Sequence, residues 1–576
     1  MKLLHLKDQT EKHEIEAVAG IEISVKVYDI QKLWSDLQNL VQEVAKDDFD
    51  GIVVSARLGS PSNYGGLEFC IRLRLSYSLI GIKAFTTLFV YTESPVEEII
   101  KEQTQQKTQP TATLLLTKGT FAFDSLHSFT VISSPPSNYN QLNEGNYKIS
   151  FLDVIKINRP PEIGNHSLAN LFGATRFAEI TGHTDAIATN AAIIEKKTDL
   201  YFKFKTDFKS NESPPFKKKT IPGIGKNILL IDDKENYGWS DVLSKVFKDA
   251  FFDFVAAGEN FVERAELKAF ETDEKTSLPK WDLILLDLRL EEIEDSDELV
   301  HKPANEYSGG DLLQKLKEAN KGIQIIVFTA SNKAWNYREL YELGADGYFV
   351  KESPELSLTD AFSVKNLEVF FKQVDSCFHY SFLKSFYFIL NSLDAILTPR
   401  TKKTNSFPLP KDFVSEYFKW IRLGNDNIAA NKNELGLTTS FILYFSVLEN
   451  IANRIIDTDT PIPNGNTADG KQLFYFEFRT AVKKLLYFEE VVRDSGNYSK
   501  TSKNSFLRSI PWQQKILNTF DFLSGYKLDM VTINQLLKKR NDIIHANVTT
   551  GKKIKVSKED VIAIFNLITN NIHDIK

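Results

Sequence analysis

Apolar and polar residues alternate in blocks along the middle of the chain. Four short apolar runs each end in polar residues: NILLI in Asp232 and Asp233, LILL in Asp287, IIVF in Thr329, and GYFV in Lys351. Short runs that are apolar on both faces are typical of parallel strands covered by helices. Because helical segments such as SGGDLLQKLKEA separate these runs, the pattern predicts a doubly wound α/β sheet over residues 226–375.

The pattern changes to a helical period after this sheet. Residues 356–397 carry apolar side chains at helical spacing, and prolines within 398–410 interrupt it. The same spacing recurs in DFVSEYFKWIRLG, TTSFILYFSVLENIANRI, LFYFEFRTAVKKLLYFEEVVRDS, PWQQKILNTFDFLS, VTINQLLKKRNDIIHANV and KEDVIAIFNLITNNIHDI. We therefore predict an all-α bundle of about five or six helices over residues 376–576.

The first 125 residues are similar to the central sheet in pattern. FDGIVVSARLGSPSNYGGLEF repeats WDLILLDLRL with EYSGGDLL, while TLFVYTES and LLLTKGT repeat IIVFTAS and YFVKES. The matched positions are Ser55 with Asp287, Gly65 and Gly66 with Gly309 and Gly310, Thr92 with Thr329, and Lys118 with Lys351. A repeat of this length predicts that the fold is used twice, although a general similarity between α/β folds is the alternative.

The polar residues of the central sheet are not repeated in the first one. Ser55 stands where Asp287 stands, and no pair of aspartates follows the opening MKLLHL. Without these carboxylates we expect no metal site and no phosphoryl acceptor in residues 1–125, which would serve packing, dimerisation or partner docking.

Residues 126–225 form a mixed connector between the two predicted sheets. ISSPPSNYNQLNEGN has the composition of a loop, NHSLANLFGATRFAEITG has the apolar spacing of a helix, and DLYFKFKTDF alternates like a strand. The lysines of SPPFKKKTIPGIGK could contact RNA or belong to a solvated linker. No group of catalytic residue types occurs in this segment.

Composition restricts the class of protein. The chain has 576 residues, a formal charge of −6, 42% hydrophobic residues and 25% charged residues, which is typical of a globular protein with about three or four domains. Because it is no polycation, any contact with nucleic acid is expected to be local. Cys70 and Cys377 lie too far apart for a metal-ligand spacing. Neither a signal peptide nor a membrane span is evident, so we expect a cytoplasmic protein without membrane association.

The strand-end residues of the central sheet suggest a specific chemistry. The carboxylates of Asp232, Asp233 and Asp287 would repel one another at close range, and hard oxygen ligands of this kind favour Mg²⁺. A metal held there can neutralise a phosphoryl group that is transferred onto one of the carboxylates. Thr329 offers a hydroxyl, and Lys351 a positive charge, to the phosphoryl oxygens.

These residues resemble the receiver domain of two-component response regulators over residues 226–360. The resemblance implies that Asp287 is the phospho-acceptor and that Asp232 and Asp233 are the metal-binding acidic pair. It also implies a histidine kinase or another phosphodonor as a partner. The switch residues that it implies are Thr329, Lys351 and the aromatic Tyr348, three residues before the lysine. The alternative is an unrelated flavodoxin-like domain whose strands end in acidic residues.

Two features depart from the receiver pattern. Glu352 follows Lys351 where the family usually has proline, and the acidic insert EEIEDSDELVHKPANEY lengthens the loop after Asp287. The first affects the geometry of the local turn, and the second can alter access to Asp287.

The stretch KKRNDIIHAN near the end of the chain combines Arg540, Asn541 and His545. Histidine is suited to proton transfer near neutral pH, and arginine is suited to holding a phosphate. Because the arginine and the histidine are five residues apart, they diverge by about 140° on a helix. One copy cannot easily close a site, whereas two copies in a homodimer can.

This segment resembles a HEPN domain, whose ribonuclease members carry an arginine and a histidine at such a spacing. The resemblance implies that Arg540, Asn541 and His545 are catalytic and that Glu449, in LYFSVLENIANRI, supports them. It implies attack of an RNA 2′-hydroxyl on the adjacent phosphate, which leaves a cyclic phosphate and requires no metal. The alternatives are a HEPN-like bundle that serves only dimerisation and an unrelated helical bundle.

The predicted architecture has two flavodoxin-like α/β receiver domains, of which the first (1–125) is degenerate, a connector (126–225), and a C-terminal all-α HEPN-like bundle. The predicted function is receiver-regulated, metal-independent cleavage of RNA by a homodimer. The HEPN resemblance implies a setting in stress response or anti-phage defence. No helix-turn-helix with a basic face is evident, which argues against a DNA-binding output. The alternative function is a non-catalytic signalling scaffold that assembles partners.

Overall fold

The structure is a computed structural model that describes most of the chain. The residues described are 1–9, 15, 20–28, 35–58, 64–92, 94–105, 111–123, 141–155, 157, 165–187, 201, 204, 217–291, 294, 303–330, 334–354, 360–397, 411–455, 462–466, 472–476, 486–489, 512–524, 529–549 and 554–573.

The first sheet has five parallel strands in the order β2-β1-β3-β4-β5. They are β1 (Lys2–Asp8), β2 (Glu22–Tyr28), β3 (Gly51–Ser55), β4 (Thr87–Tyr91) and β5 (Thr120–Phe123). The described helices around it are α1 (Ser35–Val44), α2 (Gly65–Arg74), α3 (Tyr77–Ile80), α4 (Val96–Gln105) and α5 (Glu144–Tyr147). Their apolar side chains and those of Leu4, Leu6 and Val54 form one buried core.

The second sheet has the same topology. Its strands are β7 (Asn227–Ile231), β9 (Phe251–Phe254), β10 (Leu283–Leu286), β11 (Ile325–Thr329) and β12 (Gly347–Val350). The order β9-β7-β10-β11-β12 is again 2-1-3-4-5 when the strands of this sheet are counted along the chain, which is the flavodoxin-like order. The predicted parallel α/β fold is therefore found twice, and the expected repetition of strand order in the first 125 residues is found with it.

Helices cover both faces of the second sheet. They are α9 (Trp239–Val246), α10 (Phe261–Ala269), α11 (Ser308–Ala319), α12 (Ala334–Glu342) and α13 (Asp360–Tyr380). Because side chains alternate along a strand, Ile228 and Leu230 pack against α9 and α13, whereas Leu229 and Ile231 pack against the other three helices. Two short strands, β6 (Ile221–Pro222) and β8 (Phe247–Lys248), form a separate parallel pair. Along the chain β6 precedes β7, and β8 follows α9.

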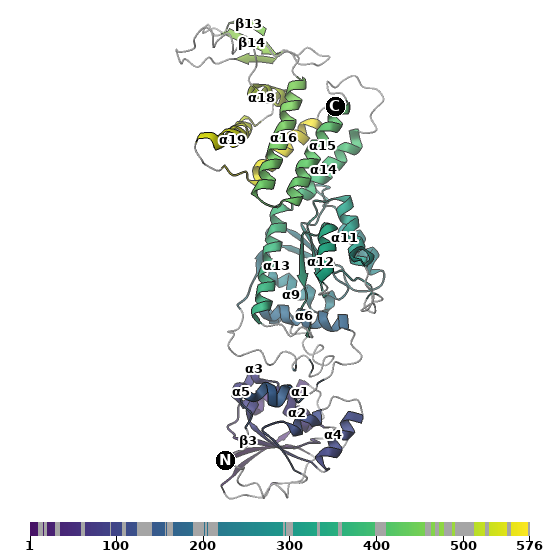
Figure 1. Ribbon diagram of the computed structural model, residues 1–576, viewed down its shortest axis with the longest axis vertical. Coiled ribbons are helices and arrows are strands. Elements are labelled where there is room, and N and C mark those ends of the chain that lie inside the picture. The colour runs from purple at the N-terminus through teal and green to yellow at the C-terminus, as the bar shows by residue number, and fades with distance from the viewer. Residues whose placement is uncertain are drawn as a thin grey trace.

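The predicted helix of the connector is present as α6 (Asn165–Thr181), which lies between the two sheets (Figure 1). The strand expected at 199–208 is wrong at Tyr201 and Phe204, which are helical. The other residues of this segment lie outside the described residues. The loop expected at 132–146 and the linker expected at 213–226 lie partly outside them as well.

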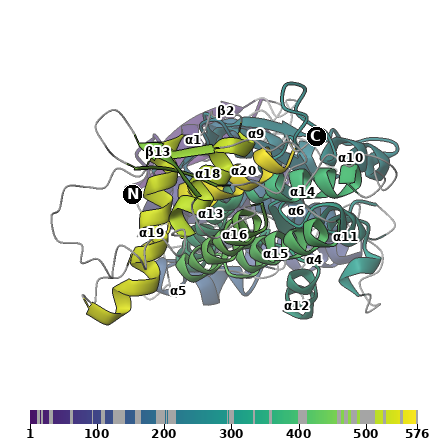
Figure 2. The ribbon, with the colours of Figure 1, turned by 90° about the horizontal axis from the view of Figure 1, so that it is seen from above.

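The C-terminal region is largely helical. Its helices are α14 (Leu383–Leu397), α15 (Lys411–Ala430), α16 (Glu434–Ile455), α18 (Trp512–Leu523), α19 (Met530–Thr549) and α20 (Lys558–His573). α15 and α16 run side by side, and α19 lies at the edge of the region (Figure 2). α20 packs on α16 and closes the core, where the rings of Phe386 and Phe565 stack.

One part of the C-terminal prediction is wrong. The segment LFYFEFRTAVKKLLYFEEVVRDS, expected to be a helix, contains β14 (Gln472–Phe476) and β15 (Leu486–Glu489), which pair with β13 (Ile462–Asn466) in an antiparallel sheet. The aromatic residues that suggested an apolar helix face also have high strand propensity. Pairing with a neighbouring strand decides between the two structures, and helical spacing does not reveal it. The region is therefore not all-α.

Among the described residues one helix, α16, is long and apolar enough to cross a membrane by length and composition alone. More than half of the relevant stretch is buried against the rest of the helical region. Its apolar side chains, such as Phe441, Tyr444 and Leu448, form the core of this region.

Ion pairs fix the helical region to the second sheet. Lys432, between α15 and α16, contacts Asp346 (2.6 Å), which also pairs with Lys317 of α11 (2.7 Å). Lys384 of α14 pairs with Asp282 (3.0 Å). Asp282 and Asp346 directly precede β10 and β12, so the helical region is attached at the amino edge of the sheet, away from the strand ends that carry the candidate site.

Asp346→Ala is expected to lower the free energy of unfolding of this part of the protein by about 3–5 kcal/mol, because it leaves the buried Lys317 ammonium without its carboxylate. Urea unfolding of the full chain measures the change. The control is Lys321→Ala, which removes an exposed pair with Asp426 and should cost no more than about 1 kcal/mol. Equal effects of the two substitutions would contradict a structural role for the buried cluster.

Candidate functional site

The carboxyl edge of the second sheet gathers three aspartates. Asp232 and Asp233 follow β7, and Asp287 follows the neighbouring strand β10, whose last residue Leu286 pairs with Ile231. One carboxylate oxygen from each of the three lies within 4.8 Å of the others. Asp232 and Asp287 are fully buried, and Asp233 is partly exposed.

Lys351 lies at the centre of this group. Its ammonium donates to Asp232 Oδ2 (2.7 Å), to Asp287 Oδ2 (2.6 Å) and to Asn170 Oδ1 of α6 (2.7 Å). A lysine ammonium has three N–H donors, so each of them has an acceptor. Burial lowers the pKa of Lys351, but the charges of Asp232 and Asp287 more than offset this, and the pKa lies above its ordinary value.

The acidic pair has strongly altered proton affinity. Burial, together with the neighbouring carboxylates, raises the pKa of Asp232 to about 7 in spite of Lys351. Burial likewise raises the pKa of Asp233 to about 6, although Lys234 pairs with it at 2.7 Å. Three carboxylates compressed in this way fit a divalent cation with hard oxygen ligands. In an octahedral Mg²⁺ site opposite oxygens are about 4.2 Å apart, so the observed 4.8 Å spread needs only a small contraction.

The other predicted receiver residues occupy the same edge or the strand beside it. Thr329 ends β11, is fully buried, and accepts a backbone hydrogen bond from Lys351 (2.8 Å). Tyr348 lies in β12 and packs into the core on the face covered by α10, α11 and α12. The structure therefore brings the aspartates, Lys351 and Thr329 together and leaves Tyr348 buried three strands away from Asp232.

The two departures from the receiver pattern have structural counterparts. Glu352, in place of proline, is buried and pairs with Arg176 of α6 (3.7 Å). In the acidic insert Glu294 accepts from the backbone N–H (2.7 Å) and hydroxyl (2.7 Å) of Ser308, at the start of α11. The insert is thus anchored beside Asp287, although most of it lies outside the described residues.

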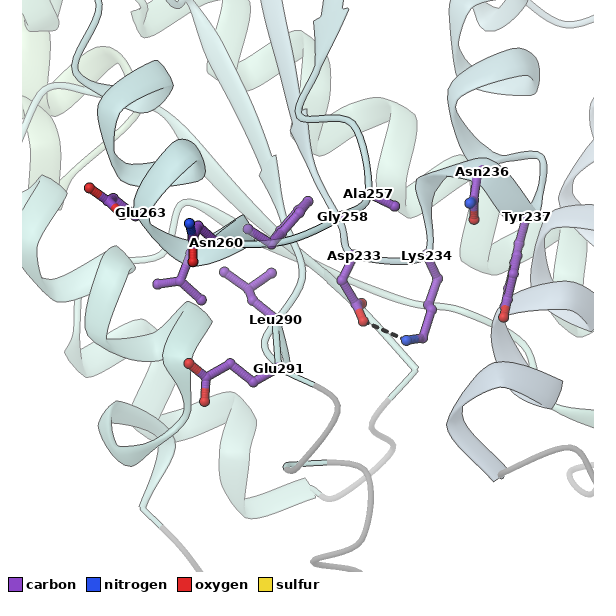
Figure 3. A pocket seen from close by; sticks show the side chains of 12 residues that line it. Asp233, Lys234, Asn236, Tyr237, Ala257, Gly258, Asn260, Glu263, Leu290 and Glu291 are labelled. Atoms are coloured by element: carbon purple, nitrogen blue, oxygen red, sulfur yellow. Dashed lines mark ion pairs between the residues drawn. The ribbon is translucent and has the colours of Figure 1, made fainter.

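A pocket of about 730 Å³ opens beside the acidic group (Figure 3). Asp233 and Lys234 line one side of it, and Asn260, Leu290 and Glu291 lie across from them. Leu290 and Glu291 follow Asp287 closely in sequence, so the pocket joins solvent to the loops that carry the aspartates. A small ligand or ion has a route to Asp233 from this side.

The first sheet has a different set of residues at the equivalent edge. Val54 pairs with Leu6 as Leu286 pairs with Ile231, so Ser55 corresponds to Asp287 and the buried Lys7 corresponds to Asp232. A cation thus stands where the second sheet has the carboxylate of Asp232, while Asp8 retains a carboxylate at the position of Asp233. That residues 1–125 bind no Mg²⁺ stays a prediction.

Two details of the predicted repeat are wrong. Lys118 precedes β5, whereas Lys351 follows β12. The three leucines before Lys118 lie in a 3₁₀ turn and not in a strand. The prediction matched residue types without the strand register. An added Cβ would come within 1.7 Å of the Ser55 carbonyl oxygen at Gly66 and within 2.0 Å of the Asp287 carbonyl oxygen at Gly309. Gly66 therefore corresponds to Gly309, one position away from the predicted pairing.

The helical region contains a second candidate group. Arg540 of α19 pairs with Glu449 of α16 (2.7 Å) and stacks on the ring of Trp512 of α18, with its guanidinium carbon 4.3 Å from the ring centre. Asn541 lies next to it and approaches the guanidinium at 3.5 Å. His545 is on the same helix and is exposed. The structure brings Arg540, Asn541 and Glu449 together within one chain.

Sequence reasoning missed Asn170, Arg176 and Trp512. The first two lie on a helix that was predicted only as a connector, and they contact residues about 180 positions away along the chain. A tryptophan at the start of a predicted helix gave one usable signal, because an arginine often stacks on an indole ring.

Mg²⁺ is expected to raise the thermal unfolding midpoint more at about pH 8 than at about pH 5, because the pKa values of Asp232 and Asp233 are raised to about 7 and 6. A raised carboxyl pKa contributes stability at low pH that is lost as the pH rises through 6 to 7, since burial, and then the neighbouring carboxylates, disfavour the ionised forms. A divalent cation restores that stability only where the carboxyls are ionised. Calorimetry with and without Mg²⁺ tests this, with Asp232→Asn as the control that should remove the pH dependence of the effect.

Comparisons with known proteins leave the family open. No family model matches the sequence, and no curated protein matches it. Among solved structures the chain matches one described as a two-component system response regulator/GGDEF domain protein, at 13% identity and a TM-score of 0.16, over 64% of this chain and 98% of the other. A score this low carries no argument about function, so the strand order and the strand-end residues remain the basis for any assignment.

Proposed function

We propose that the protein is a signalling protein in which Asp287 of the second sheet accepts a phosphoryl group and thereby controls the C-terminal helical region. The observation that carries this proposal is the group of three carboxylates within 4.8 Å around the buried Lys351. Strand order, loop position and residue type all agree with a receiver domain. The localisation that this function favours is the cytoplasm, where histidine kinases and small phosphodonors are available.

The proposed transfer is a displacement at phosphorus. An Asp287 carboxylate oxygen forms a bond to the phosphorus of an acyl phosphate or phosphoramidate, and the bond to the donor's leaving group breaks with its electron pair. Asp232 and Asp233 would hold Mg²⁺, whose contribution is to neutralise charge on the phosphoryl oxygens. Lys351 supplies a further positive charge, and the Thr329 hydroxyl would bond a phosphoryl oxygen once the group is attached.

The experiment that tests this proposal is incubation of the full chain with acetyl phosphate and Mg²⁺, followed by mass spectrometry of the intact protein and of its peptides. One phosphoryl group is expected, on the peptide that contains Asp287. Incorporation elsewhere, or none at any Mg²⁺ concentration, would contradict the proposal.

A second proposal concerns the output, and the Arg540–Glu449–Trp512 group favours it. We infer that the helical region cleaves RNA without a metal. Arg540, oriented by Glu449 and Trp512, would hold the scissile phosphate and stabilise its developing charge. His545 would take the proton from the 2′-hydroxyl, whose oxygen bonds to phosphorus while the 5′-oxygen leaves and a cyclic phosphate forms.

The proposed RNA site is composite. Arg540 and His545 diverge by about 140° around α19, and α19 lies at the edge of the helical region with His545 exposed (Figure 2). A second copy of the chain can bring its own histidine to the arginine across a twofold axis. A homodimer is therefore part of the proposal, and a non-catalytic scaffold that binds partners through the same face is its competitor.

A further inference from the structure

Helix α6 belongs to the cores of both sheets. The side chains of Leu168, Leu171 and Phe172 are buried in the core of the first sheet. Ala174, Phe177, Ala178 and Ile180, further along the same helix, are buried in the core of the second sheet. One helix of 17 residues therefore links the two cores directly. A displacement of α6 in one core changes its packing in the other.

Asn170 lies at the junction of these two sets of residues and reaches into the acceptor site. It is fully buried, and its Oδ1 accepts hydrogen bonds from Lys351 Nζ (2.7 Å) and from Trp239 Nε1 (3.2 Å). The backbone of α6 is equally close. A Cβ added at Gly173 would lie 3.2 Å from the Lys351 Cβ and 3.1 Å from the Glu352 carbonyl oxygen.

Arg176, two turns after Asn170, attaches α6 to the segment that follows the lysine. Its guanidinium pairs with Glu352 (3.7 Å), with Asp360 at the start of α13, and with Glu179 of α6 itself (2.8 Å). Arg176 and Glu352 are both nearly excluded from solvent. The residue that replaces the family's proline is thus part of the attachment of α6.

The group around Lys351 is buried and closely paired. Lys351, Asp232, Asp287 and Thr329 are all fully buried, and the ammonium lies 2.6 Å from the Asp287 oxygen. A phosphoryl group attached to this oxygen must enter between the carboxylate and the ammonium. All three ammonium donors already have acceptors, and a phosphoryl oxygen is a stronger acceptor for a cation than a neutral amide oxygen.

We propose that Asn170 is a positioning residue of the acceptor site, and that α6 transmits the state of Asp287 to the first α/β unit. This rests on the proposed acceptor function. When a phosphoryl group is attached to Asp287, the Lys351 ammonium turns to the phosphoryl oxygens. It then loses its hydrogen bond to Asn170, which is the only neutral group among the three acceptors given above. The acceptor edge of the sheet faces α6 and the first sheet, whereas the helical region is attached at the opposite edge (Figure 1). The first unit, which has Ser55 at the position of Asp287, is therefore the part that α6 connects to the acceptor edge.

Hydrogen–deuterium exchange of the full chain tests the contact itself without any phosphodonor. Asn170→Ala removes both accepted hydrogen bonds and is expected to raise the exchange rate of amides within α6 by about tenfold. Thr175→Ala is the matched control on the same helix and should leave the rate unchanged. Among the described residues the Thr175 hydroxyl bonds only to the Leu171 carbonyl oxygen (2.9 Å), within α6 itself. If Asn170→Ala leaves α6 exchange at the wild-type rate, the inference is wrong.

The same measurement with Mg²⁺ and beryllofluoride, a mimic of the phosphoryl group, tests the transmission. In the wild type, exchange is expected to slow around residues 287–291 and to rise in α6, with no further rise in α6 of Asn170→Ala. Protection of 287–291 with unchanged α6 exchange would overturn the transmission and leave the acceptor function intact. Loss of protection at 287–291, with α6 still loosened by Asn170→Ala, would overturn the acceptor function and support the tethering role of Asn170.

Discussion

Asp287→Asn is expected to abolish phosphoryl incorporation from acetyl phosphate, with the residual signal at the level of the reagent blank. The amide nitrogen and oxygen are poor nucleophiles toward phosphorus, so the substitution removes the attacking atom and leaves the shape of the side chain nearly unchanged. Because Asp287 Oδ2 accepts from Lys351 at 2.6 Å and Oδ1 accepts from the Leu288 N–H at 2.6 Å, an amide also retains one acceptor for these donors. Quantitative mass spectrometry of the intact chain gives the result directly.

The matched control for this substitution is Ser55→Ala, at the corresponding position of the first sheet. It should leave incorporation at the wild-type level. Asp232→Asn should retain the nucleophile but weaken the Mg²⁺ dependence, so incorporation would require a higher Mg²⁺ concentration. Full labelling of Asp287→Asn would show that another residue is the acceptor.

His545→Ala is expected to reduce RNA cleavage by about 10²–10⁴-fold, the usual contribution of a general acid or base. Its exposed side chain makes no contact that the helical core needs, so the melting temperature and the dimer should be unchanged. The assay uses purified protein and RNA in EDTA, since the proposed chemistry needs no metal. Arg540→Ala should weaken both RNA binding and turnover, because the guanidinium acts on the ground state and the transition state alike.

The competing scaffold function gives a different set of outcomes. Under that function the wild type and His545→Ala show the same, blank-level cleavage, and both still associate with themselves. Mixing inactive His545→Ala with inactive Arg540→Ala tests the composite site separately, because a heterodimer restores one complete pair. Restored activity in the mixture supports a shared site, whereas activity from a monomer would rule it out.

Local pattern in the sequence predicted four of the five strands of the second sheet and missed the edge strand β9. The runs ending at Asp232, Asp287, Thr329 and Lys351 are short, apolar on both faces, and separated by helices, so local pattern and global fold agree there. The polar residues lie at the ends of the strands, so they do not interrupt the apolar runs. Their convergence at one edge follows from the parallel direction of the strands.

The remaining features depend on contacts that local pattern does not encode. The spacing of Leu168, Leu171 and Phe172 predicted a helix, but not that Asn170 on it would reach Lys351, 181 residues away. The strand β14 was mistaken for a helix because aromatic residues suit both structures and only pairing distinguishes them. Lys118 was matched by letter, whereas the hydrogen-bond register places it at the other end of its strand.

Equilibrium binding of beryllofluoride in the presence of Mg²⁺ tests the acceptor site most directly, because it needs no donor chemistry and no knowledge of the kinase. We predict saturable binding of one equivalent per chain in the wild type, the same in Ser55→Ala, and none in Asp287→Asn. Binding that persists in Asp287→Asn, or a wild type that binds none while Mg²⁺ is saturating, would contradict the assignment of Asp287 as a phosphoryl acceptor.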